Sequence, residues 1–155
     1  MAVIDISELP SATPARTPWL GLDLGEKTIG VAVSDRDRMI ASPLELIRKT
    51  RFTADADRVL ELMRGREASA LVIGLPVNMD GTEGARCQSS RAFARNLLRL
   101  KADVPIAFWD ERLSTAAVQR MLTAEADLTR ARRAELVDKA AAAYILQGAL
   151  DRLGS

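Results

Sequence analysis

The sequence contains no histidine among its 155 residues and only one cysteine, Cys87. Without an imidazole, the chain cannot build a Ser-His-Asp or Cys-His catalytic site or a histidine-ligated zinc site. A single cysteine forms neither an intramolecular disulfide nor a cysteine zinc site. Any acid–base or metal chemistry in this protein is therefore expected to fall to its carboxylates.

Aromatic residues are also few, with two Trp, one Tyr and three Phe. Base stacking is therefore not expected to dominate any recognition of nucleic acid. No run approaches the roughly 18 consecutive apolar residues that a membrane helix needs. The first residues carry Asp5 and Glu8 where a secretory signal would be apolar. We expect a cytoplasmic protein with no membrane partner.

The charges nearly balance, with 22 Lys and Arg against 21 Asp and Glu, and 48% of the residues are apolar. This length and composition are typical of one globular domain. All but four of the basic residues are arginine, whose planar guanidinium can donate two parallel hydrogen bonds to a phosphate. A GC-rich genome would produce the same bias, so composition permits a nucleic-acid partner without establishing one.

The chain divides into a proline-containing start and one longer patterned region. Residues 1–18 hold three prolines and are expected to form a flexible arm before a domain over 19–153. The domain opens with two apolar runs across a short glycine-containing link, which predicts an antiparallel hairpin. The expected strands cover 19–23, 28–33, 39–47, 70–74 and 104–109, and the expected helices cover 54–63, 85–100, 114–122 and 131–153. This order predicts an α/β fold, a mixed five-stranded sheet with helices on both faces.

Four carboxylates fall where such a fold would place an active site. Asp23 ends the first expected strand, and Asp110 and Glu111 end the fifth. Sites in open α/β sheets usually lie beyond the carboxyl ends of the strands. Asp138 lies on an apolar face of the last expected helix, where a salt bridge to an arginine would be the usual explanation, but the two strand-end acids shift the interpretation toward a shared metal site. Acids that meet in one crevice favour Mg²⁺ or Mn²⁺, and a pair of such ions can hydrolyse phosphodiesters without histidine.

Four motifs occur in an order that resembles a known family. They are Gly21-x-Asp23-x-Gly25, Gly74-Leu75-Pro76-x-Asn78-Met79-x-Gly81-x-x-Gly84, Asp110-Glu111-Arg112-Leu113-Ser114-Thr115 and Val137-Asp138-x-x-Ala141-Ala142-x-x-Ile145-Leu146. Together they look like the YqgF/RuvX family of the ribonuclease H-like superfamily, over about residues 19–153. The resemblance implies a ribonuclease H-like fold and a nuclease. Its expected role is trimming of the 5′ end of the small-subunit ribosomal RNA precursor, which the resemblance favours, with Holliday-junction resolution as the alternative.

The resemblance also implies a site and partners. Asp23, Glu111 and Asp138 would be the catalytic, metal-binding acids, with Asp110 as the alternative to Glu111. Neighbouring residues on a strand point to opposite faces, so one of that pair reaches the metal, and we favour Glu111. The implied partners are structured RNA or branched DNA and ribosomal precursor particles. We expect a monomer or a weak homodimer.

A glycine-rich loop over 74–84 joins the fourth strand to the following helix. It could present backbone N–H groups to phosphate, with Thr82 capping the helix, or it could be an ordinary strand–helix connection. Arg112 could reach the scissile phosphate or pair with Asp110. The nucleic acid could be RNA or DNA, because no residue recognisably reads a 2′-hydroxyl.

The following helix carries an arginine stripe. Arg91, Arg95 and Arg99 share one helix face, and no acid occurs between Gly84 and Lys101. A merely solvated face would mix in acids, so the pattern favours a surface that follows phosphates. The candidate substrate contacts are Asn78, Glu83, Arg86, Arg91, Arg95 and Arg112.

Two other functions compete with the nuclease. Sugar kinases and actin-like proteins also open with a hairpin bearing Asp-x-Gly, but they clamp ATP between two lobes, and 155 residues supply one. ATP binding would favour that alternative. The second is a ribosome- or RNA-binding module with vestigial acids, which would bind RNA without cleaving it under any divalent metal.

Overall fold

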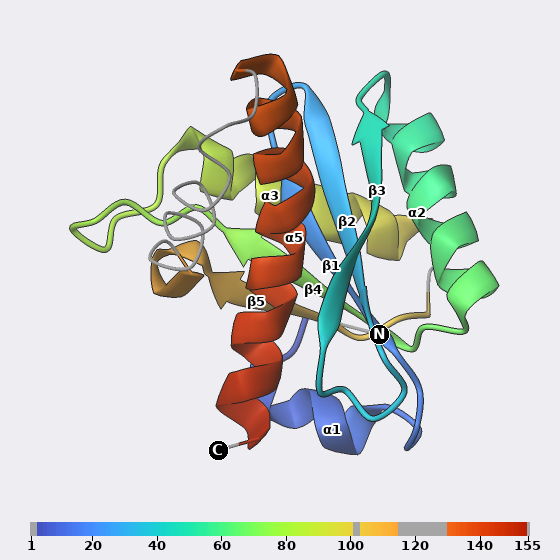
Figure 1. Cartoon of the computed structure of the whole chain (residues 1–155). Helices are drawn as coiled ribbons and strands as arrows, with labels where there is room; N and C mark the ends of the chain where they lie inside the picture. The colour runs from blue at the N-terminus through green and yellow to red at the C-terminus, as the bar shows by residue number, and fades with distance from the viewer. Residues whose placement is uncertain (1–2, 101–102, 115–129, 155) are drawn as a thin grey trace.

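A computed structural model describes the backbone of residues 3–100, 103–114 and 130–154, and their side chains except 114 and 130–139. Within these residues, five strands form one mixed sheet in the order β3-β2-β1-β4-β5 (Figure 1). The strands are β1 (Trp19–Leu24), β2 (Thr28–Ser34), β3 (Ala41–Arg48), β4 (Ala70–Leu75) and β5 (Ile106–Asp110). β1, β4 and β5 run parallel, whereas β2 is antiparallel to both β1 and β3. The predicted hairpin start and mixed sheet are confirmed.

One face of the sheet is covered by α2 (Phe52–Arg66) and α3 (Ala85–Arg99). Alternate residues of β1, among them Leu20 and Leu22, point to this face and are fully buried there. They pack with Val59 of α2 and Leu97 of α3 in one apolar cluster. The helical period of α2 and α3 thus supplies the apolar stripes that cover this face.

The other face is covered by the long helix α5 (Arg130–Gly154), which crosses the sheet in front of the strands in Figure 1. Leu146 and Ala149 of α5 pack against Val72 in a second apolar cluster. Small residues allow the close approach: a Cβ on Gly21 of β1 would lie only 2.8 Å from Leu146 Cβ. Helices on both faces of the sheet were predicted and are confirmed.

The segment before β1 packs onto the domain, in contrast to the flexible arm expected over 1–18. It contains a short 3₁₀ helix, η1 (Ile6–Glu8), and a four-residue helix, α1 (Leu9–Ala12). Leu9 is fully buried in the cluster that includes Trp19 and Leu150. The N–H of Ile4 donates to the carbonyl of Ile106 at 2.8 Å. The prolines signalled irregular structure, but scattered apolar residues of this segment find partners near the end of α5.

Ser114, the expected start of a helix over 114–122, instead ends a short 3₁₀ helix, η2 (Glu111–Ser114). The rest of that expected helix lies outside the described residues. Among the helices that the structure describes, none combines the length and the apolar character needed to cross a membrane.

Candidate active site

Asp23 and Glu111 come together at one edge of the sheet. Asp23 is the penultimate residue of β1, and Glu111 follows β5 directly as the first residue of η2. Both strands run parallel to β4, so their carboxyl ends lie at the same edge. The two carboxyl groups share a hydrogen bond. The structure therefore brings together two of the acids that the sequence singled out.

Gly74 makes room for this pair of acids. In the β1–β4 register Leu22 lies opposite Ile73, so Gly74 is one step nearer the sheet edge, beside Asp23. A Cβ on Gly74 would lie 2.6 Å from Glu111 Oε1, closer than a real side chain allows. The missing side chain of Gly74 therefore lets Glu111 lie across β4, close to Asp23.

The carboxyl of Glu111 holds its proton unusually strongly. Burial disfavours its charged form, and the charge of Asp23 and the hydrogen bond between the two groups add to this effect. Together they raise the pKa of Glu111 from 4.5 to about 7, although the charge of Arg86 opposes the rise. Two ionised carboxylates close enough to share a hydrogen bond repel each other. A divalent cation bound between them would relieve this repulsion.

Asp110, the alternative to Glu111, is held by an arginine instead. Arg112 Nε and Nη2 donate to Asp110 Oδ2 at 2.9 and 2.6 Å, and the backbone N–H of Arg112 donates to Oδ1 at 2.9 Å. These bonds hold the pKa of Asp110 below its usual value. Of the two roles considered for Arg112, pairing with Asp110 is the one seen. Arg112 also links to the β4–α3 loop, because its Nη1 donates to the Asn78 carbonyl at 3.4 Å.

The third predicted acid, Asp138, belongs to α5. α5 passes close over β1, since a Cβ on Gly21 would lie 3.0 Å from the Ala142 carbonyl oxygen. Its C-terminal end lies beside Trp19, the first residue of β1, so the helix and the strand run in opposite directions. The side chain of Asp138 lies outside the described residues, and its part in the site stays a prediction. The described side chains contain no group of three acids that could hold a metal ion.

The β4–α3 loop is closed by its own side chains. Asn78 Nδ2 donates to Thr82 Oγ1 at 3.0 Å, and Thr82 Oγ1 donates to Asp80 Oδ1 at 2.6 Å. The prediction that Thr82 caps α3 is wrong, because the N-cap is Gly84 and no side chain caps the helix. Asn78 is exposed on this loop, and its contact with substrate stays a prediction.

The arginine stripe of α3 is partly neutralised. Arg91 donates from Nε and Nη2 to the two carboxylate oxygens of Glu83 at 2.7 and 2.8 Å. Its guanidinium also lies 5.0 Å from the centroid of the Phe108 ring. Arg95 and Arg99 are exposed further along the helix. This ion pair was not predicted from the sequence, because Glu83 lies just before the acid-free interval between Gly84 and Lys101.

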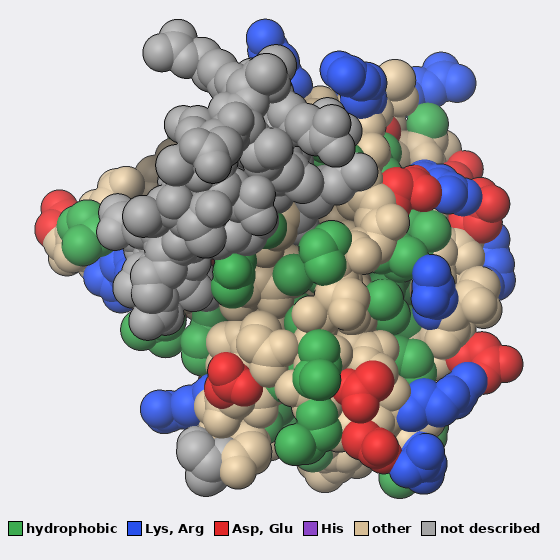
Figure 2. All heavy atoms as spheres, in the orientation of Figure 1, with side chains coloured by type: hydrophobic (Ala, Val, Ile, Leu, Met, Phe, Trp, Pro, Cys, Tyr) green, Lys and Arg blue, Asp and Glu red, His purple; other side chains and the backbone are tan. Residues whose placement is uncertain are grey.

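A cleft of about 920 Å³ opens beside Asp23. It is lined by the end of β1 and the β1–β2 turn, by the end of β3 and by the first turns of α3. Four basic residues line it, namely Lys27, Arg48, Lys49 and Arg86. Figure 2 shows Lys and Arg side chains along the upper edge of the molecule, where Figure 1 places the β1–β2 turn and the end of β3.

Of these four cations, the sequence analysis predicted only Arg86. Lys27, Arg48 and Lys49 were missed because they come from two segments that the antiparallel register joins, with Thr28 opposite Arg48. Predicting the register of the β2–β3 pair would have brought these three cations together. Arg91, Arg95 and Arg112 are not among the described residues that line the cleft.

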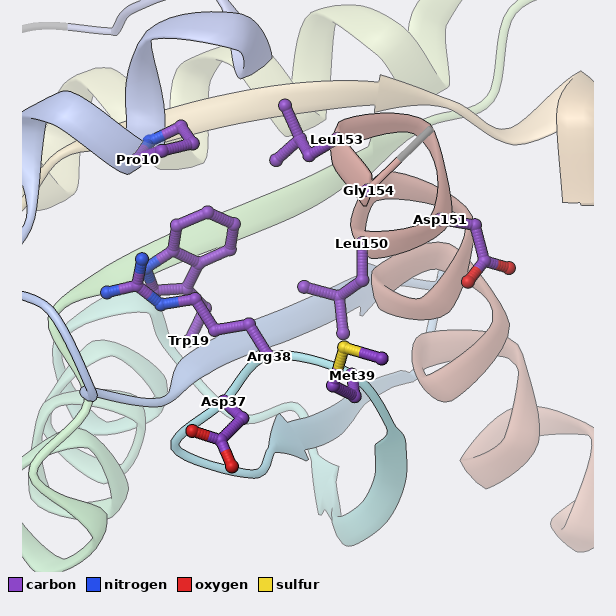
Figure 3. Close-up of a pocket in the computed structure, with 9 residues that line it drawn as sticks. All are labelled: Pro10, Trp19, Asp37, Arg38, Met39, Leu150, Asp151, Leu153 and Gly154. Carbon is purple, nitrogen blue, oxygen red and sulfur yellow. The ribbon is translucent and has the colours of Figure 1, made fainter.

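A smaller pocket of about 400 Å³ lies at the other end of β1, between α1 and the end of α5 (Figure 3). The Arg38 guanidinium lies 4.4 Å from the centroid of the Trp19 ring there. Its two acids, Asp37 and Asp151, point away from each other. The paired carboxylates thus distinguish the edge at Asp23 as the candidate active site.

Comparison with known proteins places this site in a family. A family model described as "RuvX: Holliday junction resolvase" matches residues 17–152. A protein of Phenylobacterium zucineum, named as a candidate pre-16S rRNA nuclease, is 72% identical over 99% of this chain and 98% of its own length. A protein of the same name from Caulobacter vibrioides is 63% identical over the same shares of the two chains.

Solved structures share the fold at low sequence identity. Thermus thermophilus RuvC in complex with a Holliday junction substrate is 18% identical, with a TM-score of 0.57 over 90% of this chain and 97% of its own. The yeast mitochondrial Holliday junction resolvase is 10% identical, with a TM-score of 0.50 over 96% and 85% of the two chains. The predicted ribonuclease H-like fold is confirmed. On the family match and on its relatives, the chain belongs to the RuvX family.

Proposed function

We propose that this protein is a metal-dependent nuclease that hydrolyses phosphodiester bonds at the 5′ end of the small-subunit ribosomal RNA precursor. The observation that carries the proposal is the contact between Asp23 and Glu111 at the wall of a cleft rimmed by cations. The names of relatives up to 72% identical support the RNA substrate. The family match over residues 17–152 supports the nuclease chemistry.

The donor set suits a hard divalent cation. The pair offers only carboxylate oxygens, which favour Mg²⁺ or Mn²⁺ over softer metals. We propose Asp23, Glu111 and Asp138 as the ligands. Helix geometry supports Asp138, because it lies four residues before Ala142, about 6 Å along the axis. Asp23 lies a similar distance beyond Gly21, at two residues of about 3.3 Å each. When bound, such ions activate water and stabilise the leaving oxygen.

The chain's own residues prepare this chemistry. Glu111 must release its proton before both acids can bind a cation, and the positive charge of Arg86 favours that release by lowering its pKa. Gly74 keeps the carboxyl of Glu111 close to Asp23. The basic residues around the cleft would hold the phosphates on either side of the bond to be cut.

The experiment compares cleavage of two substrates by the purified protein with Mg²⁺ or Mn²⁺. One substrate is an RNA fragment spanning the precursor's 5′ extension, and the other is a four-way DNA junction. We expect the RNA to be cut, and Asp23→Asn to lose at least about 100-fold of the rate. Asp57→Asn, an exposed acid on α2, is the matched control and should keep full activity.

Junction resolution is the second candidate function. The description of the matching family model and the shared fold with a junction-bound RuvC favour it. Cleavage of the DNA junction but not of the RNA would establish it in place of the RNA proposal. RNA binding without cleavage of either substrate under both metals would instead identify a binding module.

We also propose that the protein meets its RNA on ribosomal precursor particles, as a monomer or a weak homodimer in the cytoplasm. Sedimentation of a tagged protein with the precursor of the small subunit would test the first point. Light scattering of the purified chain over a range of concentrations would test the second.

A further inference from the structure

One wall of the cleft is a basic surface built by the β1–β2 turn and the end of β3. It consists of Lys27 from the turn and of Arg48 and Lys49 from the strand end, and we call it the hairpin wall. Asp23 lies at its base, where β1 ends. The wall therefore stands directly beside Asp23, one of the proposed catalytic acids.

Backbone pairing holds the hairpin wall in place. Thr28 lies opposite Arg48 in the β2–β3 register, and the N–H of Lys49 donates to the carbonyl of Lys27 at 2.9 Å. The Lys49 ammonium also donates to the carbonyl of Gly25 at 3.1 Å. Three cations from two segments are thus brought together by the sheet itself, before any ligand arrives.

The positive charge of this wall is not neutralised within the described structure. Lys27, Arg48 and Lys49 are exposed and form no ion pair with a described acid. In contrast, Arg91 is bound by Glu83, and Arg112 is bound by Asp110. The nearest acid on the same turn is Glu26, which also lines the cleft.

The facing wall comes from the start of α3. Arg86 and Ser89 line the cleft from this side. The α3 N-cap is Gly84, which has no side chain that could cap the first N–H groups of the helix. Those N–H groups and the Arg86 guanidinium are suited to phosphate oxygens. Positive groups therefore flank Asp23 from both sides.

We infer that the phosphate backbone of the RNA strand lies between the hairpin wall and the start of α3, with Lys27 and Arg48 contacting phosphates next to the cut. The inference rests on the proposed function and names the strand path for that site. It differs from the path along Arg91, Arg95 and Arg99 that the sequence suggested. Arg99 lies 13 residues after Arg86, about 20 Å along the helix, and Arg91 is already paired.

The test measures binding without cleavage. A short fluorescein-labelled single-stranded RNA is titrated with each protein in excess chelator, and fluorescence anisotropy gives Kd over a range of salt concentrations. We expect Lys27→Gln/Arg48→Gln to weaken binding about 10-fold. Two lost phosphate contacts should also reduce the slope of log K against log salt by about 1.4. Glu26→Gln, which removes an acid from the same cleft, should tighten binding.

The matched control is Arg64→Gln/Arg66→Gln at the end of α2, which removes the same charge from exposed positions away from the cleft. It should leave the salt slope unchanged. Equal weakening by both double variants would mean that only total charge matters, and would overturn the inference. A larger effect of Arg95→Gln/Arg99→Gln would overturn it in favour of the α3 stripe, and absence of RNA binding by the unaltered protein would also refute it.

The outcome is separable from the proposed function. Binding in chelator does not depend on catalysis, so a protein that binds through Lys27 and Arg48 but never cuts RNA would retain the inferred strand path while losing the nuclease proposal. Conversely, full cleavage by the Lys27→Gln/Arg48→Gln variant at unchanged KM would reject the strand path and leave the nuclease intact. Thermal melting of each variant checks that the fold is kept.

Discussion

The carboxyl of Glu111 lies against Gly74, so closely that a Cβ on this glycine would be 2.6 Å from Glu111 Oε1. Gly74 stands between the two strands whose ends carry the paired acids, β1 and β5. A single missing side chain on β4 thus determines whether Glu111 can reach Asp23. Without this role, a glycine in a fully buried strand would be unfavourable, because it has no side chain to pack.

Gly74→Ala is therefore expected to impair catalysis more than folding. The added methyl group must displace Glu111, and it would also lie 2.5 Å from Ile145 Cδ1. We expect at least a 10-fold lower cleavage rate and a loss of about 1–3 kcal/mol in the free energy of unfolding. Cleavage assays and urea denaturation measure the two effects.

Gly65→Ala is the matched control for that variant. Gly65 lies within α2, and a Cβ there would meet nothing within 4 Å. Alanine should stabilise the helix by about 0.5–1 kcal/mol and leave cleavage unchanged. Full activity of Gly74→Ala beside a normal Gly65→Ala would show that Glu111 need not lie near Asp23.

Asp110 and Glu111 should respond differently to loss of charge. Asp110 is occupied by three hydrogen-bond donors of Arg112, whereas Glu111 contacts Asp23. We expect Glu111→Gln to lower the cleavage rate at least about 100-fold and Asp110→Asn to keep most of it. Initial rates at saturating Mg²⁺ distinguish the two, and the reverse order would make Asp110 the metal ligand.

The sequence predicted the part of the candidate site that lies at the ends of parallel strands. Asp23 and Glu111 could be matched because parallel strands end at a common edge, which follows from element order alone. Strand alternation implied that only one of Asp110 and Glu111 reaches the metal, and the family resemblance favoured Glu111. The structure adds the contact with Asp23 on one side and the pairing with Arg112 on the other.

The basic surface could not be predicted in the same way. Lys27 and Arg48 come together through the β2–β3 register, which depends on the pairing of two strands and not on either segment alone. No acidic partner was expected for the α3 stripe because Glu83 precedes the helix. In the structure, however, Arg91 donates a hydrogen bond to Glu83. Local sequence patterns therefore could not predict contacts that depend on strand pairing or on a reversal of the chain.

The proton on Glu111 predicts a pH dependence of stability in the metal-free protein. Its pKa is about 7 in the folded chain, above the ordinary value of 4.5, so the folded state holds a proton that the unfolded state loses between these values. The stability that this proton contributes is present below about pH 4.5 and is lost as pH rises through 7. Glu111→Gln carries no such group.

Urea denaturation in chelator at several pH values should reveal this difference. Relative to Glu111→Gln, the unaltered protein should lose about 1–3 kcal/mol of unfolding free energy between about pH 5 and pH 8. Asp110→Asn is a useful comparison, because the pKa of Asp110 in the unaltered protein is lowered. The stability that the Asp110 carboxylate contributes is therefore lost as pH falls below the usual range of an aspartate, the opposite direction from Glu111. A constant difference between the unaltered protein and Glu111→Gln would contradict the raised pKa.

The segment before β1 should contribute measurably to stability. Leu9 is fully buried and belongs to the same apolar cluster as Leu150 near the end of α5. Leu9→Ala removes buried methyl groups and leaves a cavity, so we expect a loss of about 2–5 kcal/mol in the free energy of unfolding. Val3→Ala, in the same segment but 38% exposed, should cost less than about 0.5 kcal/mol. Urea midpoints give both values, and equal small losses would mean that this segment behaves as the arm that its prolines suggested.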